Sequence, residues 1–288
     1  MSRASDPTQG ENTYFIDPES GAEMARLMDQ DRLMTKGMGG LFPERFDLST
    51  MHRLLDIGCG PGGWALEVAY AHPGIEVVGI DISHTMVEYA RAQARVQGLD
   101  NAHFRVMDAT KLLDFPSATF DLVNGRLLVG FMPKAAWPTL IRECLRISRP
   151  GGVIRLTEAE NWGITNSPAY EQLNALATRA LQRAGSGFSP DGRSIGITPM
   201  LGSFLRDAGF QQIQHKAHAI DYSAGTEVHG GWYQNFLVSF KLLQPFLIKM
   251  GGTTQEEVER LYQQALVEML QDDFRAIWFF LTVWGQKP

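Results

Sequence analysis

A short glycine-rich segment follows two apolar residues and an acid near position 55. Residues 54–63 read Leu-Leu-Asp-Ile-Gly-Cys-Gly-Pro-Gly-Gly, and helix-like residues follow from 64 to 70. Glycine has no Cβ, so the backbone at Gly58 and Gly60 can turn sharply off a strand and approach a ligand closely. The segment predicts a cofactor-binding loop between a strand and a helix.

The residues around these glycines favour a cationic ligand over a phosphate. The spacing Gly58-x-Gly60-x-x-Gly63 also fits the dinucleotide fingerprint, so the glycines alone do not identify the ligand. Asp56 would repel a pyrophosphate, and Pro61 removes a backbone N–H that a phosphate would use at the helix start. A ligand with an ammonium group and no phosphate fits better, and S-adenosylmethionine has that character.

Two further acids fall at the ends of predicted strands. Residues 76–81 read as a strand that ends in Asp81, where a carboxylate can accept hydrogen bonds from both ribose hydroxyls. Residues 104–109 read as another strand, whose Asp108 can accept from an exocyclic amine. Two residues that can cover an adenine face follow the first of these acids, Ile82 and Met86.

These motifs resemble those of class I S-adenosylmethionine-dependent methyltransferases, in the branch that modifies small molecules. The resemblance covers about residues 50–160 closely and the remainder loosely. It implies that the cofactor contacts the glycine loop at its methionine end and the later acids at its ribose and adenine. The cofactor residues expected on this basis are Tyr14, Asp56, Gly58, Cys59, Gly60, Asp81, Ile82, Met86, Asp108, Ala109 and Arg126.

The catalytic base expected from the family is missing. Members often carry an Arg, apolar residues and a His pair after the fourth strand, but here Gly130 and Phe131 follow Arg126 in place of those His residues. Nothing near Cys59 would lower its pKa, so we interpret it as a packing residue and not a nucleophile. The sequence therefore names no catalytic residue.

The acceptor is expected between the end of the fifth strand and a C-terminal cap. Trp, Phe, Tyr and Leu are dense in residues 232–246, which favours a small, partly hydrophobic molecule as substrate for O-, N- or C-methylation. Each candidate contact could instead serve packing. The candidates are Glu158, Asn161, Trp162, His229 and Trp232.

An α/β fold has to position these residues. Residues 51–158 alternate strand and helix, which predicts a parallel sheet with helices on both faces. Further strands are predicted at 210–219 and 274–284. The resemblance implies a Rossmann-like, doubly wound sheet of seven strands, the last antiparallel, with a helical N-terminal lid and C-terminal cap insertions.

Four segments are predicted along the chain: a disordered tail (1–12), lid helices (13–45), the S-adenosylmethionine-binding core (46–160), and the rest of the sheet with its helical substrate cap (161–288). On the lid, Arg32 or Lys36 could pair with the methionine carboxylate. Polar residues interrupt the apolar segment 232–248, so we expect a helix pair broken near Pro245 and no membrane span.

The composition of the chain limits the kinds of partner and the cellular location to be expected. The formal net charge is −6 and no Lys/Arg-rich run occurs, which disfavours a nucleic-acid substrate. Cys59 and Cys144, the two cysteines, suggest neither a disulfide framework nor a metal site. The polar N-terminus lacks an apolar signal core, so a cytoplasmic location is the default. A homodimer is left open.

The sequence is compatible with three functions. The first is a small-molecule methyltransferase. The second is an S-adenosylmethionine-binding enzyme of the same fold that catalyses another reaction, such as a cyclisation. The third is a nicotinamide oxidoreductase or a non-catalytic nucleotide-binding module. The methyltransferase is the function that the motifs favour.

Overall fold

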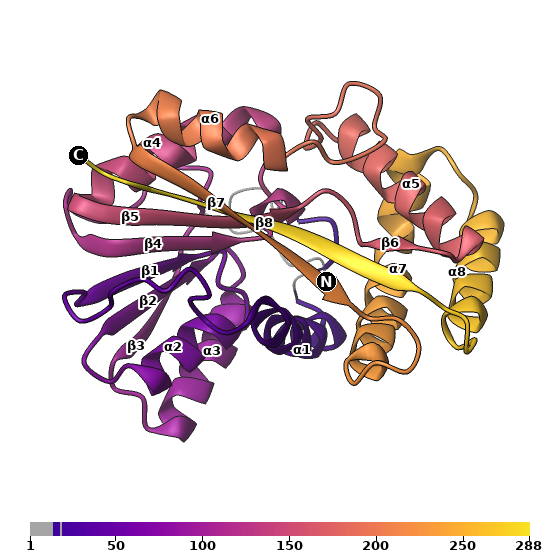
Figure 1. Cartoon of the computed structure of the whole chain (residues 1–288), viewed down its shortest axis with the longest axis horizontal. Coiled ribbons are helices and arrows are strands. Elements are labelled where there is room, and N and C mark those ends of the chain that lie inside the picture. Colours follow the sequence, from indigo (N-terminus) through magenta and orange to yellow (C-terminus); the bar gives the residue numbers. More distant parts are fainter. Residues whose placement is uncertain (1–13, 18) are drawn as a thin grey trace, which may run out of the picture.

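A mixed eight-stranded sheet runs through the centre of the molecule (Figure 1). The computed structural model describes residues 14–17 and 19–288. Across the sheet the strands lie in the order β3 (Ala102–Val106), β2 (Glu76–Asp81), β1 (Arg53–Ile57), β4 (Phe120–Arg126), β5 (Ser148–Ala159) and β8 (Ala276–Gln286). One edge of β8 pairs with β5 and, further along, with β6 (Ile164–Thr165). The other edge of β8 pairs with β7 (Gln211–Asp221).

The predicted α/β, Rossmann-like sheet is confirmed, with one strand more than expected. β1 to β5 pair in parallel, and β8 is antiparallel to each of its partners. The additional strand, β6, is not among the strands predicted from the sequence. Two residues are too few to show a period in the sequence, so only the pairing reveals it.

Helices cover both faces of the sheet. On one face, α2 (Gly63–Ala71) and α3 (His84–Gln97) pack against the alternate strand residues that include Leu54. On the other face, α4 (Trp137–Ile147) and α6 (Thr198–Ala208) pack against the set that includes Leu55. Two short 3-10 helices, η1 (Leu128–Gly130) and η2 (Lys134–Ala136), connect β4 to α4.

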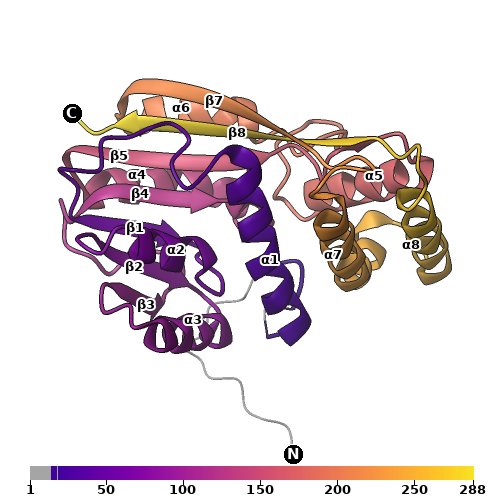
Figure 2. The ribbon, with the colours of Figure 1, turned by 60° about the horizontal axis from the view of Figure 1, so that its bottom comes forward.

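The lid helix α1 (Gly21–Met38) lies between the sheet and a helical cap (Figure 2). We expected helix from about residue 14, but it begins after Ser20, whose Oγ accepts a hydrogen bond from Glu23 N at 3.4 Å. Ser20 therefore acts as an N-cap and fixes the helix start. Residues 14–17 precede the helix in irregular backbone.

The cap consists of α5 (Pro168–Arg183), α7 (His229–Gly251) and α8 (Gln255–Met269), which share one apolar cluster. The predicted break near Pro245 is wrong, because α7 continues through this proline and ends before Gly252. Proline removes one helical hydrogen bond. Burial of the α7 face that carries Phe240 and Leu247 outweighs that loss.

The predicted tail, 1–12, lies outside the described residues. Within residues 14–17 and 19–288, no helix has the length and apolarity needed to cross a membrane.

Candidate functional site

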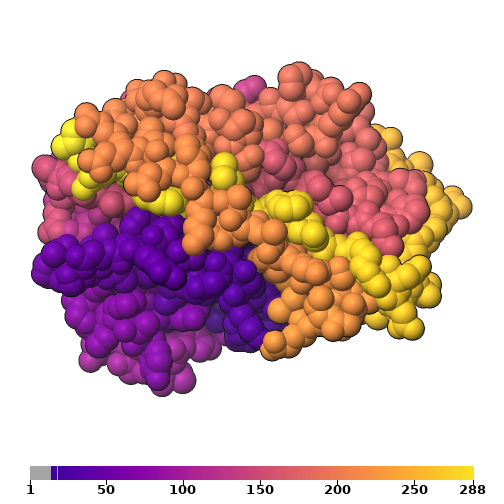
Figure 3. Space-filling view, in the orientation of Figure 1, coloured from indigo at the N-terminus to yellow at the C-terminus, as the bar shows by residue number. Residues whose placement is uncertain are grey.

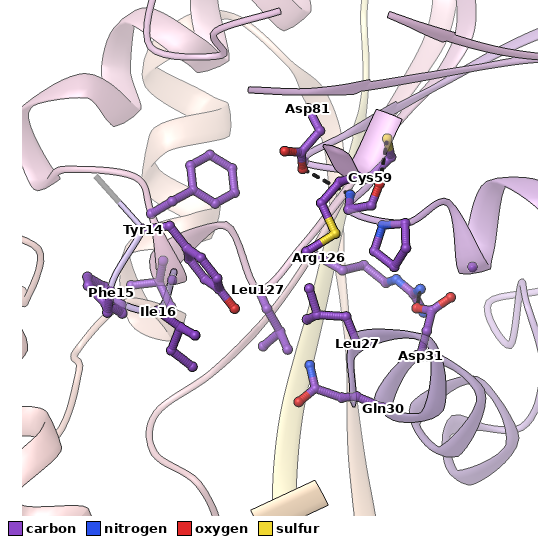
Figure 4. A pocket seen from close by; sticks show the side chains of 18 of the residues that line it. Tyr14, Phe15, Ile16, Leu27, Gln30, Asp31, Cys59, Asp81, Arg126 and Leu127 are labelled. Atoms are coloured by element: carbon purple, nitrogen blue, oxygen red, sulfur yellow. Dashed lines mark hydrogen bonds and ion pairs between the residues drawn. The ribbon is translucent and has the colours of Figure 1, made fainter. Parts of the chain in front are cut away.

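A cavity of about 220 Å³ opens at the carboxyl ends of the parallel strands. Its wall includes the glycine loop and α1, from which Figure 4 labels Cys59, Leu27 and Asp31. The cap also contributes to the wall. The side formed by β1, β2 and the loop after β3 carries acids, and we call it the acidic side. The opposite side is mainly aromatic and aliphatic, and we call it the apolar side; it is formed by the segment before α1, the loop after β5, the segment before α6, α7 and β8. Its members are Phe15, Ile16, Trp162, Ile195, Leu243 and Trp278.

The glycine loop reaches the cavity through left-handed backbone. Gly58 has φ 64° and Gly60 has φ 52°, a region that favours glycine. A Cβ at Gly58 would lie 2.8 Å from the Phe131 ring, so space also requires glycine there. Cys59, between them, lines the cavity, and burial raises the pKa of its thiol, which agrees with a packing role.

Asp81 holds the glycine loop while it faces the cavity. Its Oδ2 accepts a hydrogen bond from Gly60 N and its Oδ1 accepts one from Ser83 N, each at 2.9 Å. Burial raises the pKa of Asp81, and these backbone donors oppose the shift. Ile82 and Met86, expected beside an adenine, line the same part of the cavity.

Asp56 presents one free carboxylate oxygen. It is 5% exposed, and its Oδ1 accepts a hydrogen bond from Asn124 Nδ2 at 2.8 Å. Burial raises the pKa of Asp56 to about 7, opposed by the Asn124 bond and the Arg155 charge. No hydrogen bond from a described residue reaches Oδ2, which is therefore available to a cation in the cavity.

Asp108 completes the acidic side, in the loop that follows β3. It accepts hydrogen bonds from Thr110 N at 2.9 Å and Thr110 Oγ1 at 2.6 Å, and it pairs with Lys111 at 3.1 Å. Burial raises its pKa, but these partners outweigh burial and hold the pKa below its usual value. Ala109 lies beside it in the wall.

Arg126 connects the sheet to the lid. At the end of β4 it forms an ion pair with Asp31 of α1, and its Nη1 donates to Thr35 Oγ1 at 3.2 Å. Figure 4 shows its guanidinium directed at Asp31. Burial lowers the pKa of Arg126 to about 9. A Cβ at Gly63 would overlap the Asp31 carboxylate, so this glycine lets the lid come close.

The segment before α1 crosses the cavity. Tyr14 Oη donates to Glu23 Oε1 at 2.5 Å, and Arg26 forks onto the same carboxylate at 2.7 and 2.6 Å. The Phe15 ring stacks on Phe246 of the cap, with centroids 4.8 Å apart. Tyr14 thus lies in the wall as the sequence suggested, held between the lid and the cap.

The lid residues that face the cavity are not the two that the sequence suggested, Arg32 and Lys36. Leu27, Gln30 and Asp31 line it, at helical spacing. Arg32 and Lys36 lie on the opposite side of α1 in exposed ion pairs, with Asp29 and Glu227 respectively. Packing against the glycine loop and α7 decides which face of α1 meets the cavity, and the positions of the charged residues alone do not predict it.

Of the five substrate residues that the sequence suggested, two line the cavity and three do not. Asn161 and Trp162 line the cavity. Glu158 lies beneath it, with Oε1 accepting from Leu128 N at 2.7 Å. This bond supports the loop in which Leu127 adopts a left-handed φ of 53°.

His229 and Trp232 both lie outside the cavity wall. His229 Nδ1 is 2.9 Å from Tyr222 O, and Trp232 is fully buried against Trp278, with ring centroids 5.1 Å apart. In place of these two, the cap contributes Ser239 and Leu243 to the wall. They occupy ordinary positions of an apolar helix, so no signal in the sequence marks them.

The charge of the cavity wall fits S-adenosylmethionine. Its acids outnumber its two arginines, Arg26 and Arg126, and each arginine is already paired with a carboxylate. An excess of negative charge suits a sulfonium and an ammonium group. In residues 14–17 and 19–288, no three His, Cys, Asp or Glu side chains converge as metal ligands.

Sequence comparisons agree with this geometry. The methyltransferase domain profile matches residues 54–152. Methyltransferase pytC from Aspergillus terreus is 28% identical over 82% of this chain and 71% of the relative. The 27-O-demethylrifamycin SV methyltransferase of Amycolatopsis mediterranei is 36% identical over 60% of each chain.

Solved structures share the fold. Phosphoethanolamine N-methyltransferase 2 from Haemonchus contortus, solved with S-adenosylhomocysteine, is 18% identical with a TM-score of 0.52, over 94% of this chain and 57% of that one. The cyclase SpnF is 20% identical with a TM-score of 0.50, over 94% and 97%. Together, the glycine loop, the strand order and the sequence matches show that the chain belongs to the class I S-adenosylmethionine-dependent methyltransferases.

Proposed function

We propose that the protein transfers a methyl group from S-adenosylmethionine to a small, partly hydrophobic molecule held at the apolar side of the cavity. The observation that carries this proposal is the continuity of the cavity from the acids of β1 and β2 to the aromatic residues Phe15, Trp162 and Trp278. One ligand at the acidic side and one at the apolar side would meet inside a single chamber.

The proposed cofactor contacts follow the acidic side. Asp56 would accept from the ammonium group, Asp81 from the ribose hydroxyls and Asp108 from the adenine amine. These roles use the free Oδ2 of Asp56 and the position of each acid at or just beyond the carboxyl end of its strand. The further proposed contacts are Tyr14, Gly58, Cys59, Gly60, Ile82, Met86, Ala109 and Arg126.

The charges at the cavity favour a neutral acceptor. Arg26 and Arg126 are engaged by Glu23 and Asp31, so neither is available to a phosphate or carboxylate on the substrate. Phe15, Trp162 and Leu243 supply apolar contact area. Asn161, which also lines the wall, offers a polar group that can orient the acceptor.

The residues around the reaction act mainly by position. The cofactor, when bound, supplies an activated methyl group, so the protein has to orient the acceptor and exclude water. No histidine is among the described residues of the wall. This favours acceptors that are nucleophilic without a strong base, such as an acidic hydroxyl, a neutral amine or a stabilised carbanion.

O-methylation is the first reaction to assay, because the names of two relatives point to it. One is the 27-O-demethylrifamycin SV methyltransferase described above. The other is the nocamycin O-methyltransferase of Saccharothrix syringae, which is 27% identical over 67% of this chain. The purified protein is incubated with S-adenosylmethionine and a panel of neutral phenols and enols, with phosphorylated amines as controls. We expect S-adenosylhomocysteine to form in a one-to-one ratio with the neutral substrate consumed.

Two results would contradict the proposal. Consumption of substrate without S-adenosylhomocysteine would instead support the cyclisation alternative. Methylation of the phosphorylated amines alone would show that the apolar side does not select the acceptor. A cytoplasmic location and a homodimer are further proposals from the sequence, and size-exclusion chromatography tests the second.

A further inference from the structure

A row of buried polar side chains crosses three strands behind Asp56. In the register of the sheet, Asp56 of β1 is the partner of Asn124 of β4, and Asn124 is the partner of Arg155 of β5. Partners in adjacent strands place their side chains on the same face of a sheet. The row therefore runs sideways through β1, β4 and β5, which lie together in Figure 1.

Hydrogen bonds connect the members of this row. Asn124 Nδ2 donates to Asp56 Oδ1 at 2.8 Å, and Arg155 Nη1 donates to Asn124 Oδ1, also at 2.8 Å. Glu44, in the loop after α1, accepts from Arg155 Nε at 3.1 Å and Nη2 at 3.2 Å. Asn124 is 0% exposed, and so is the Glu44 side chain.

The bonding leaves each member one orientation. A guanidinium can only donate, so the atom of Asn124 that faces Arg155 has to be its oxygen. The amide nitrogen then points at Asp56, fixes Oδ1 and leaves Oδ2 toward the cavity. Glu44 plays the same part for Arg155, because its two oxygens match the fork of the guanidinium.

A buried row of polar and charged side chains is not needed to stabilise the fold at this position. A buried ion pair often contributes no more than well-packed apolar residues of similar volume, because both charges lose their hydration. The neighbouring strand residues Leu54 and Leu122 are apolar and fully buried on the same face. The polar row is therefore better explained by what it does to Asp56.

We infer that Asn124, Arg155 and Glu44 are positioning residues that orient the Asp56 carboxylate toward the ammonium group of the cofactor. This inference rests on the proposed contact between Asp56 and the cofactor. Asn124 acts directly on Asp56, Arg155 acts through Asn124, and Glu44 balances the Arg155 charge.

Two ligands distinguish orientation of Asp56 from general packing. S-adenosylhomocysteine carries the ammonium group, whereas 5′-methylthioadenosine has the same adenosine but no amino acid part. Affinities for both are measured by calorimetry. Asn124→Asp keeps the shape and the Arg155 bond but replaces the donor to Asp56. Arg155→Met removes the donor that orients Asn124.

We expect Asn124→Asp and Arg155→Met to weaken S-adenosylhomocysteine binding roughly ten- to a hundredfold, the range of one hydrogen bond to a charged group. Affinity for 5′-methylthioadenosine should change less than about twofold. Ser148→Ala is the matched control, because Ser148 is fully buried in the same sheet and its Oγ donates to Cys144 O at 2.7 Å, at the end of β5 that lies away from the cavity. It should change neither affinity.

The outcomes separate this inference from the proposed function. Equal weakening of both ligands, or undiminished affinity for S-adenosylhomocysteine, would overturn the positioning role. Asp56→Asn is measured in parallel. If it too leaves S-adenosylhomocysteine binding unchanged, the proposed cofactor contact itself is wrong. If only Asp56→Asn weakens binding, the contact stands and the inference fails. Should Arg155→Met not fold, the isosteric Asn124→Asp decides alone.

Discussion

A buried carboxylate that has to meet a cation makes ligand binding depend on pH. Burial raises the pKa of Asp56 to about 7 in the ligand-free protein, against an unperturbed value of about 4. The folded state therefore holds this proton more tightly than the unfolded state. From this group alone, stability of the ligand-free protein falls as the pH rises between about 4 and 7.

The first prediction concerns S-adenosylhomocysteine affinity. The proposed contact pairs its ammonium group with the ionised form of Asp56, so affinity should rise with pH up to about 7 and then level off. Calorimetry in two buffers of different ionisation enthalpy should detect proton release below that pH. Asp56→Asn should remove part of the slope, and the remainder belongs to Asp81, whose pKa burial also raises. A flat profile in the wild-type protein would contradict this role of Asp56.

Residue types at strand ends were predictable, whereas the groups that hold them were not. Asp56, Asp81 and Asp108 follow apolar strands and could be recognised from local sequence. Glu44 and Arg155 lie 111 positions apart, and only the folded sheet brings them together. A polar residue inside a strand gives no local sign of its partner.

At the scale of elements, the approach of α1 to the glycine loop decides how tightly the cavity closes. Leu27 and Asp31 face that loop, and Figure 3 shows the lid in indigo lying against the orange cap. The sequence predicted a lid helix here, but not which of its faces meets the cofactor loop. That face is selected by packing against α2, α7 and β7, which lie far from α1 in the sequence.

The second prediction tests the close packing of α1 on the glycine loop by adding a single methyl group. Gly63→Ala places a Cβ against the Asp31 carboxylate, which has to move away and weaken its pair with Arg126. We expect about tenfold weaker S-adenosylhomocysteine binding, as for the loss of one charged hydrogen bond. Gly74→Ala is the control, since a Cβ there meets nothing within 4 Å. Calorimetry on both variants checks the difference, and equal affinities would argue against a close lid.

The third prediction separates the two sides of the cavity. Leu243→Trp in α7 adds bulk at the apolar side, so turnover of a neutral acceptor should fall at least tenfold while S-adenosylhomocysteine affinity stays within about twofold. Lys249→Trp, at an exposed position of the same helix, should change neither. Loss of cofactor affinity in Leu243→Trp would mean that the two sides are not distinct.

At the scale of the whole molecule, the cavity is where core, lid and cap meet. Its wall includes residues from positions 14 to 278, so a ligand there would contact the core, the lid and the cap together. The sequence predicted the three parts and their order. It could not predict the cap residues in the wall, because a buried helix face does not indicate what it is buried against.

The fourth prediction follows from this arrangement. At a hundredfold excess over its Kd, S-adenosylhomocysteine should stabilise the folded protein by about 2.7 kcal/mol. Thermal unfolding should show one cooperative transition that moves upward with S-adenosylhomocysteine and stays in place with NAD. A shift with NAD alone would favour the oxidoreductase instead.

The position of β8 in the chain has a consequence for synthesis. This strand pairs with β5, β6 and β7, yet the ribosome makes it after all of them. Chains begin to fold while they are still being translated, from the N-terminal side. The nascent protein would thus display an unpaired β5 edge until residues 276–286 leave the exit tunnel, and a chaperone that shields this edge in the meantime would raise the yield of native enzyme.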